Sequence, residues 1–150
     1  MKSKRKDDCN WIFTKHDKVK FNEINKSLKI YSTKNNSNNE KSIKSNKKNN
    51  YEIWFKQQPL ILHVACRDLE SAIKLLETAR KIFRRAGIIG VTSKKVMIEI
   101  IGSEHLETIV SDRNFVIDEK YLKQLIKYAN MNFGDNLRNI HIFLKIITNL

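Results

Sequence analysis

The sequence predicts an α+β fold: a mixed sheet with about three covering helices, in one domain that carries a disordered Lys/Asn-rich insertion. Two observations predict it. Short runs of bulky apolar residues alternate with stretches whose apolar residues recur every three or four positions, so both strands and amphipathic helices are expected. Residues 33–50 are nearly all Lys, Asn and Ser, and they cannot bury enough apolar surface to offset the entropy of ordering them.

The clearest pattern lies in residues 59–101, which read as strand, helix and hairpin. A continuous apolar run at 60–65 follows the only proline in the chain and is typical of a buried strand. Asp68 is placed to cap the next helix, which we expect to extend over 68–86 and to end at Gly87. Two further apolar runs on either side of a polar turn predict a hairpin, at residues 88–91 and 96–101.

Segments on either side of this pattern supply the remaining elements. A bulky apolar run around Trp11 predicts a short strand, and the spacing over 17–30 predicts a helix. Another helix is expected over 118–133, with an aspartate at its start as a cap and a glycine after its end. Spacing alone fits either strand or helix at 140–144, and we expect a strand. The sheet strands then centre on Trp11, Trp54, Leu60, Ile88, Val96 and Ile140, and a ferredoxin-like order of elements is compatible with them.

These elements divide the chain into three parts. The N-terminal strand and helix occupy residues 1–32, and the disordered insertion occupies residues 33–50. The main α+β core occupies residues 51–150. The 41% of hydrophobic residues can supply a core for the first and third parts together, but not for the whole length.

The charge of the chain is strongly basic and unevenly distributed. The formal net charge is +13, and residues 1–56 hold 15 Lys and Arg against 6 Asp and Glu. Such a balance favours a polyanionic partner, most commonly a nucleic acid. The plainer alternative is that the lysines only solvate a disordered stretch.

Several classes of function are disfavoured by what the sequence lacks. Two distant cysteines make no disulfide framework, and a reducing, cytoplasmic setting is expected. No apolar run approaches the roughly 20 residues that a membrane span needs. No GxGxxG, GxxxxGK[ST] or HExxH motif occurs, and the four histidines fall on separate elements, so no metal is expected. The few acidic residues sit mostly at helix starts and turns, which argues against a hydrolase with two carboxylates.

The central segment also carries a family resemblance. Its residues PLILHVACRDLESAIKLLETARKIFRRAGI resemble the signature of the tRNA wybutosine-synthesising protein 3 family of archaea and eukaryotes. Upstream, WIFTKHD at 11–17 is similar to the family's W-aliphatic-F-x-x-H-D segment. Downstream, residues 121–122 and 128–130 are similar to its Y-L and A-N positions. The matching positions of the central segment are Pro59, Ile61, Leu62, His63, Val64, Cys66, Phe83, Arg84 and Gly87.

This resemblance implies an S-adenosylmethionine-dependent tRNA methyltransferase of wybutosine biosynthesis. Such an enzyme transfers a methyl group to N4 of the tricyclic wyosine-type base at position 37 of tRNA(Phe). The acceptor nitrogen must be aligned with the methyl group, and a nearby base can take the proton that it loses. The exposed base needs a stacking surface, and the tRNA backbone needs Lys and Arg.

The chain departs from the family pattern at its start. Family members carry a Ser-rich S-C-S-G-R motif ahead of the tryptophan segment, whereas this chain has only Cys9 near that place. We therefore expect either a fragment or a protein that has lost part of the site. The second function that the sequence allows is a truncated, non-catalytic tRNA-binding homologue.

Two residues are candidates for the catalysis that the resemblance implies. His63 interrupts the apolar strand, either as a site residue or as a core histidine bonded to a backbone carbonyl. Arg84 matches the family motif, and it otherwise complements the dipole at the end of the helix. We expect the His63 imidazole and the Arg84 guanidinium to line one pocket for the base and the methyl donor.

Cofactor contacts are expected at the end of the same strand and on the last helix. Cys66 directly precedes a helix N-terminus, which favours anionic or polar ligands, and a small buried thiol is its plainer role. Arg67 beside it can reach a carboxylate or a phosphate, or else lies on the surface. Asn130 is polar amid an apolar helix face, so it either contacts the cofactor or makes a capping or core hydrogen bond.

RNA contacts are expected from two places. Trp11 serves either as a stacking platform for a base or as a core aromatic residue, and His16 follows it as a contact or a turn histidine. Lys74, Lys81 and Arg85 share a face of the helix expected over 68–86, and they would form a basic stripe toward the RNA.

Overall fold

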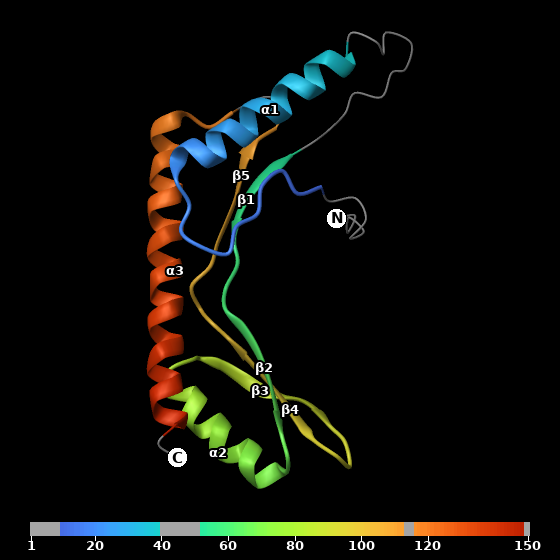
Figure 1. The fold of residues 1–150 in the computed structure, drawn as a ribbon, viewed down its shortest axis with the longest axis vertical. Coiled ribbons are helices and arrows are strands. Elements are labelled where there is room, and N and C mark those ends of the chain that lie inside the picture. The colour runs from blue at the N-terminus through green and yellow to red at the C-terminus, as the bar shows by residue number, and fades with distance from the viewer. Residues whose placement is uncertain (1–9, 40–51, 113–115, 149–150) are drawn as a thin grey trace.

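The structure is a computed structural model that describes residues 10–39, 52–112 and 116–148. These ranges contain three helices and five strands, and the α+β class is confirmed (Figure 1). In chain order the elements are α1 (Phe21–Asn39), β1 (Ile53–Gln57), β2 (Ile61–Cys66), α2 (Leu69–Arg80), β3 (Arg85–Val91), β4 (Val96–Ile101), β5 (Leu106–Ser111) and α3 (Glu119–Ile147).

The strands form two antiparallel sheets rather than one mixed sheet. The lower sheet of Figure 1 has the order β2-β4-β3, and the upper sheet pairs β1 with β5. The chain passes between the two sheets twice, through residues 58–60 and 102–105. These crossings are tied together by the Gly102 amide, which donates to the Leu60 carbonyl at 2.8 Å. Pro59 lies beside this bond, at a position where its missing N–H removes no ladder hydrogen bond.

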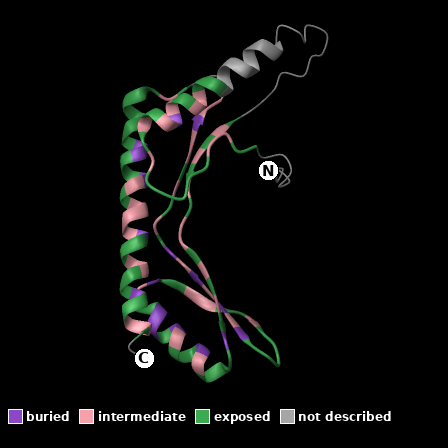
Figure 2. Ribbon diagram, in the orientation of Figure 1, coloured by how far each residue is buried: buried purple, intermediate pink, exposed green. Residues whose placement is uncertain are grey.

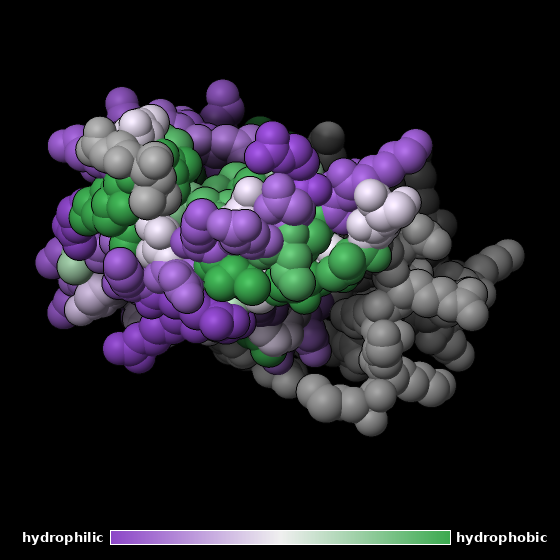
Figure 3. Space-filling view, turned by 90° about the horizontal axis from the view of Figure 1, so that it is seen from below, coloured by the Kyte–Doolittle hydropathy of each residue, from purple (hydrophilic) through white to green (hydrophobic). Residues whose placement is uncertain are grey.

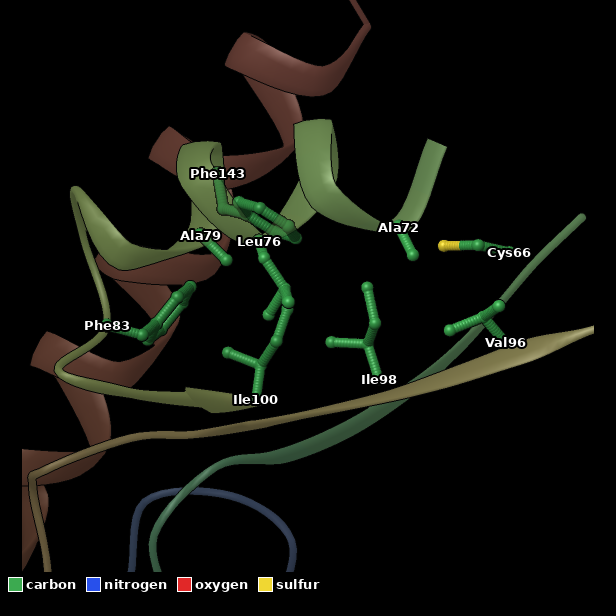
Figure 4. Packing of buried hydrophobic residues seen from close by; sticks show 9 residues of the cluster. All are labelled: Cys66, Ala72, Leu76, Ala79, Phe83, Val96, Ile98, Ile100 and Phe143. Carbon is green, nitrogen blue, oxygen red and sulfur yellow. The ribbon is translucent and has the colours of Figure 1, made fainter. Parts of the chain in front are cut away.

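The main core lies between α2, the lower sheet and the C-terminal part of α3. Alternate residues of β4, Val96, Ile98 and Ile100, point toward α2 and are buried (Figure 4). Phe143 of α3 is 2% exposed and meets Phe83 edge-on, with 5.7 Å between ring centroids. The other buried members of this cluster are Cys66, Ala72, Leu76 and Ala79.

A second, smaller cluster holds the other end of α3. Ile24 of α1 packs against Leu122 and Ile126 of α3, and Phe13 of the preceding irregular segment joins them. Figure 2 shows that buried residues are more scattered here than around α2. Hydrogen bonds add to the packing at this end, and one of them runs from Lys15 Nζ to Glu23 Oε1 at 2.8 Å.

The starts of α2 and α3 agree with the sequence, whereas α1 begins at Phe21 and not at residue 17, and all three predicted helix ends were wrong. Asp68 and Asp118 each cap their helix by accepting from a backbone amide three residues on. α2 ends at Arg80, not near Gly87, because the chain from Arg85 on pairs with β4 as strand β3, and the Arg80 guanidinium bonds the Ala86 carbonyl of that strand. α3 does not stop at Gly134. A single glycine costs a helix only about 1 kcal/mol, and continuing the helix brings Phe143 into the core.

Two predicted strands are also corrected. Residues 140–144 belong to α3, since Phe143 and Ile147 fall one turn apart on the face that meets the core. The segment around Trp11 has no regular strand structure in the described residues. The first part of the predicted insertion, through Asn39, continues α1, and residues 40–50 lie outside the described ranges.

The exposed surface of the lower end is partly apolar. Seen from below, hydrophobic side chains form a band across the end built by α2 and the β3–β4 hairpin, with hydrophilic ones around it (Figure 3). Exposed members of this end include Leu69, Ile73, Ile89 and Val91. None of the helices in the described ranges is both long enough and apolar enough to cross a membrane.

Candidate active site

The lower sheet has one covered face and one open face. Side chains alternate along each strand, so the residues next in sequence to those that point toward α2 point to the opposite side. Residues paired across an antiparallel ladder share a face. We call the side away from α2 the open face, and its register gives three cross-strand rows. These rows are Ile61–Ile101–Arg85, His63–Glu99–Gly87 and Ala65–Met97–Gly90.

The middle row holds an acid–base pair. His63 Nε2 lies 2.9 Å from Glu99 Oε2, and the two side chains are 51% and 33% exposed. A carboxylate only accepts hydrogen bonds, so the imidazole nitrogen that faces it carries the hydrogen. The lone pair of a neutral His63 ring is then on Nδ1. An imidazole oriented by a carboxylate is an arrangement that general bases use. Here the arrangement lies on an exposed surface.

Strand β3 contributes one cation and two bare positions to the open face. Arg85 lies at one end, where its Nη2 donates to the Gly102 carbonyl at 3.2 Å. Gly87 and Gly90 follow, and neither has a positive φ. A Cβ built on Gly87 would meet nothing within 4 Å. The backbone of β3 is therefore accessible beside Glu99.

Arg84 and Arg85 are placed differently from the sequence prediction. Arg85 is in the ladder and on the open face with His63, whereas Arg84 precedes β3 and is exposed. The two described cavities are lined by other residues than His63 and Arg84. The ladder thus pairs His63 with Glu99 and places Arg85 on the same face in a neighbouring row, and a role for Arg84 stays a prediction.

The predicted basic stripe does not form on one helix face. Lys74 is on α2 and bonds Glu70 one turn earlier at 2.8 Å. Lys81 is the C-terminal cap residue of α2, whereas Arg85 lies on the far side of the sheet. The stripe was wrong because α2 ends at Arg80, five residues before Arg85.

The predicted cofactor residues lie in different parts of the molecule. Cys66 faces α2 inside the main core, where burial raises the pKa of its thiol and the nearby Asp68 carboxylate adds to the effect. Arg67 is largely exposed, and its Nε reaches Asp68 at 3.3 Å. Asn130 is on α3, and both ends of its amide are bonded to the backbone of Val19 at 2.9 Å. These three side chains do not assemble one cofactor site.

The remaining candidates lie in the N-terminal segment. Trp11 is 72% exposed, so it is not a core residue, and its ring is accessible for stacking. His16 is exposed in the turn that precedes α1. Their contacts with RNA stay predictions.

A cavity of about 460 Å³ lies at the other end of the molecule. Its walls come from α1, β1, β5 and the start of α3, and they are mainly apolar. None of the site residues predicted from the sequence lines this cavity. Within the described ranges no group of three His, Cys, Asp or Glu side chains is placed to hold a metal ion. The His63–Glu99 pair on the open face, where a carboxylate orients an exposed imidazole, is the candidate site.

Sequence reasoning missed Glu99. The signal for it is a single acidic residue inside the apolar run 96–101, at a position that alternates with the core residues. A charged side chain in a strand of this kind points away from the core. Its partnership with His63 depends on the register between β2 and β4, which no local pattern contains.

Comparisons with known proteins identify the family of this chain. The family model described as Methyltransferase TYW3 matches residues 1–149. The chain belongs to this family. A protein of Methanocaldococcus jannaschii, named tRNA(Phe) 7-((3-amino-3-carboxypropyl)-4-demethylwyosine(37)-N(4))-methyltransferase, is 38% identical over 87 residues, which cover 57% of this chain and 45% of that protein. The tRNA wybutosine-synthesizing protein 3 homolog of Danio rerio is 30% identical over 142 residues, 93% of this chain and 49% of that protein.

Solved structures share the fold of this TYW3-family chain. The PH1069 protein of Pyrococcus horikoshii aligns with a TM-score of 0.70 at 24% identity, over 95% of this chain and 66% of that one. A hypothetical protein from Aeropyrum pernix aligns with a TM-score of 0.69 at 20% identity, over 89% and 71%. The chain spans about half the length of the two curated relatives described above.

Proposed function

We propose that this protein methylates N4 of a wyosine-type base in tRNA(Phe), with His63 as the acceptor of the proton that the nitrogen loses. The family match over residues 1–149 carries the proposal. The name of the Methanocaldococcus jannaschii relative supplies the substrate and the atom that is methylated. The net charge of +13 suits a polyanionic substrate.

The position of His63 supports its role as a base. When the new N–C bond forms, the acceptor nitrogen must release a hydrogen as a proton. Nδ1 of His63 holds the free lone pair, since Nε2 faces the Glu99 carboxylate. A positioned general base contributes about 10²–10⁴-fold to a rate. His63 is also exposed enough for a macromolecular substrate to reach it.

The family implies a methyl donor, and we propose S-adenosylmethionine, which supplies an activated methyl group. The predicted contacts to it, Cys66, Arg67 and Asn130, are dispersed between the lower end of the molecule and the Val19 backbone. We therefore assign no donor-binding role to them as a group. The role that we assign, that of His63, concerns the base that accepts the methyl group and not the methyl donor.

Methyl transfer from radiolabelled S-adenosylmethionine tests the proposal. The acceptor is tRNA(Phe) that carries the unmethylated wyosine-type precursor, and unmodified tRNA(Phe) is the control. Incorporation into the first RNA and not into the second is expected. Equal background incorporation into both would contradict the proposal.

A second candidate function is a tRNA-binding homologue that has no turnover. One observation favours it: the predicted cofactor residues do not come together. Filter binding over a salt series separates the candidates when it is combined with the transfer assay. Salt-sensitive binding to tRNA without incorporation would favour this second function.

A further inference from the structure

The open face of the lower sheet combines features that suit one flat ligand. On the β3 side it has two glycines, and a Cβ built on Gly87 would meet nothing, while one on Gly90 would meet only Met97 Cβ at 4.0 Å. On the β2 side Ile61 is 57% exposed. Met97 and Ile101 between them are half-buried. The β3 side of this face therefore has no side chains at Gly87 and Gly90, beyond Arg85 at its start.

This surface carries one acid–base pair, and cations lie at both of its ends. The His63–Glu99 pair is in the middle row. Arg85 lies at the end where β3 begins, and Lys94 and Lys95 are exposed in the β3–β4 turn at the other end. Two bare glycine positions beside an acid–base pair, with cations beyond both ends, fit an RNA base whose neighbouring phosphates lie on either side. The opposite face of the sheet is filled by α2.

We infer that the open face is the platform on which the acceptor base lies, against the bare β3 backbone at Gly87, and that Glu99 is a positioning residue for His63. The inference rests on the proposed function for the identity of the base. Stacked there, the base lies across the middle row, beside the Glu99 carboxylate and the His63 ring that this carboxylate orients. The Glu99 carboxylate fixes the ring so that Nδ1 is the nitrogen available for the proton. Arg85, Lys94 and Lys95 bind flanking phosphates.

A size series at Gly87 tests the platform. We compare Gly87→Ala and Gly87→Leu with the matched changes Gly134→Ala and Gly134→Leu, because an added Cβ at either glycine meets nothing within 4 Å. The two alanine variants should therefore keep the fold, and thermal melting selects the leucine variants that do so as well. The readouts are the Kd for the precursor-bearing anticodon stem-loop and the rate of methyl transfer.

The platform predicts that Gly87→Leu raises the Kd at least tenfold and that Gly87→Ala has a smaller effect in the same direction. Both Gly134 variants should stay within twofold of the unsubstituted protein. Unchanged binding and transfer by Gly87→Leu would overturn the platform and leave the proposed function standing. Binding that depends on Gly87 without any methyl transfer would support the platform and refute the proposed methyl transfer. No RNA binding at all, or a dimer that Gly87→Leu dissociates, would overturn the platform.

The positioning role of Glu99 has its own test. Glu99→Ala should slow transfer by up to about 10²-fold, since a misplaced group can cost that much, without a change in the Kd for RNA. Glu99→Gln keeps an oxygen that accepts from Nε2, so it should restore most of the rate. The ring nitrogens of His63 provide a spectroscopic readout: one tautomer with hydrogen on Nε2 is expected, and a mixture in Glu99→Ala. Equal rates and ring spectra in all three proteins would refute the role.

Discussion

The two ends of α3 are held in different ways. At the C-terminal end Phe143 packs among Phe83, α2 and the buried face of the lower sheet, so regular elements cover one another with apolar surface. At the N-terminal end α3 contacts a small cluster around Ile24. It also forms hydrogen bonds, through Asn130, with the irregular segment that precedes α1. A cavity of about 460 Å³ also lies at this end. The difference indicates that most of the stability resides in the lower end, and that the upper end opens more readily.

This contrast bears on function because the candidate site belongs to the stable end. The open face is the back of the same three strands whose other face forms the main core. A site on strands that are fixed by packing holds its groups more accurately than one on loops. The predictions below test the contrast between the two ends, from the largest expected effect to the smallest.

Truncation of Phe143 should have the largest effect. Removing a buried phenylalanine costs about 3–5 kcal/mol through lost burial and a residual cavity, and Phe143 is 2% exposed. Urea unfolding of Phe143→Ala measures the loss. The adjacent Leu144→Ala is the control, because Leu144 is exposed and its truncation should cost less than about 0.5 kcal/mol. Equal midpoints for the two variants would show that the main core is not where the stability lies.

An added methyl group at Gly102 should disturb the junction between the sheets. A Cβ there would lie 2.7 Å from Asn136 Oδ1 and 3.3 Å from the Leu60 backbone nitrogen. Asn136 is buried and its Nδ2 already donates to the Glu104 carbonyl, so it cannot move freely. Overpacking of this kind costs about 1–3 kcal/mol. Gly87→Ala, which adds the same methyl group in open space, should unfold at the same urea concentration as the unsubstituted protein, and a matching loss there would contradict the account.

The upper end should respond locally to loss of Asn130. Asn130→Ala removes both hydrogen bonds to the Val19 backbone, and we expect a loss of about 1 kcal/mol. Hydrogen exchange should accelerate in residues 10–20 while the amides of β4 stay protected. Asn132→Ala, which loses only a bond to Gln57, controls for truncation on the same helix. Acceleration that spread equally to β4 would mean that the two ends unfold as one unit.

The smallest effect concerns the cap of α2 and its pH dependence. Hydrogen bonds from Ser71, and then from Arg67, lower the pKa of Asp68 below its ordinary value. A carboxyl group with a lowered pKa in the folded state adds stability above its unfolded pKa and loses it as the pH falls through the folded value. Stability should therefore decline below about pH 4, and less steeply in Asp68→Asn. Parallel pH profiles of the two proteins would contradict this cause.

How much of the fold was predictable depended on whether the signal was local. Asp68 and Asp118 are next to the amides that they cap, so both helix starts were found. The end of α3 was missed because Gly134 is a local stop signal, whereas Phe143 gains its burial from α2 and Phe83, distant in sequence. The same holds for Gly87, whose place in β3 depends on its pairing with Glu99.

The candidate site was predictable only in part, for the same reason. His63 stood out because a histidine inside an apolar run needs an explanation. Glu99 and Gly87 become its neighbours through strand register, which a one-residue shift would change completely. Arg84 was preferred over Arg85 on the motif, whereas alternation along β3 places Arg85 on the open face.

The most direct measurement is the rate of methyl transfer to precursor-bearing tRNA(Phe) by His63→Ala, beside His141→Ala as an exposed histidine on α3. The account predicts a decrease of at least about 10²-fold for His63→Ala, with the Kd for the RNA within twofold and the His141 variant unaffected. A His63→Ala rate equal to that of His141→Ala would contradict the assignment of acceptor chemistry to the open face.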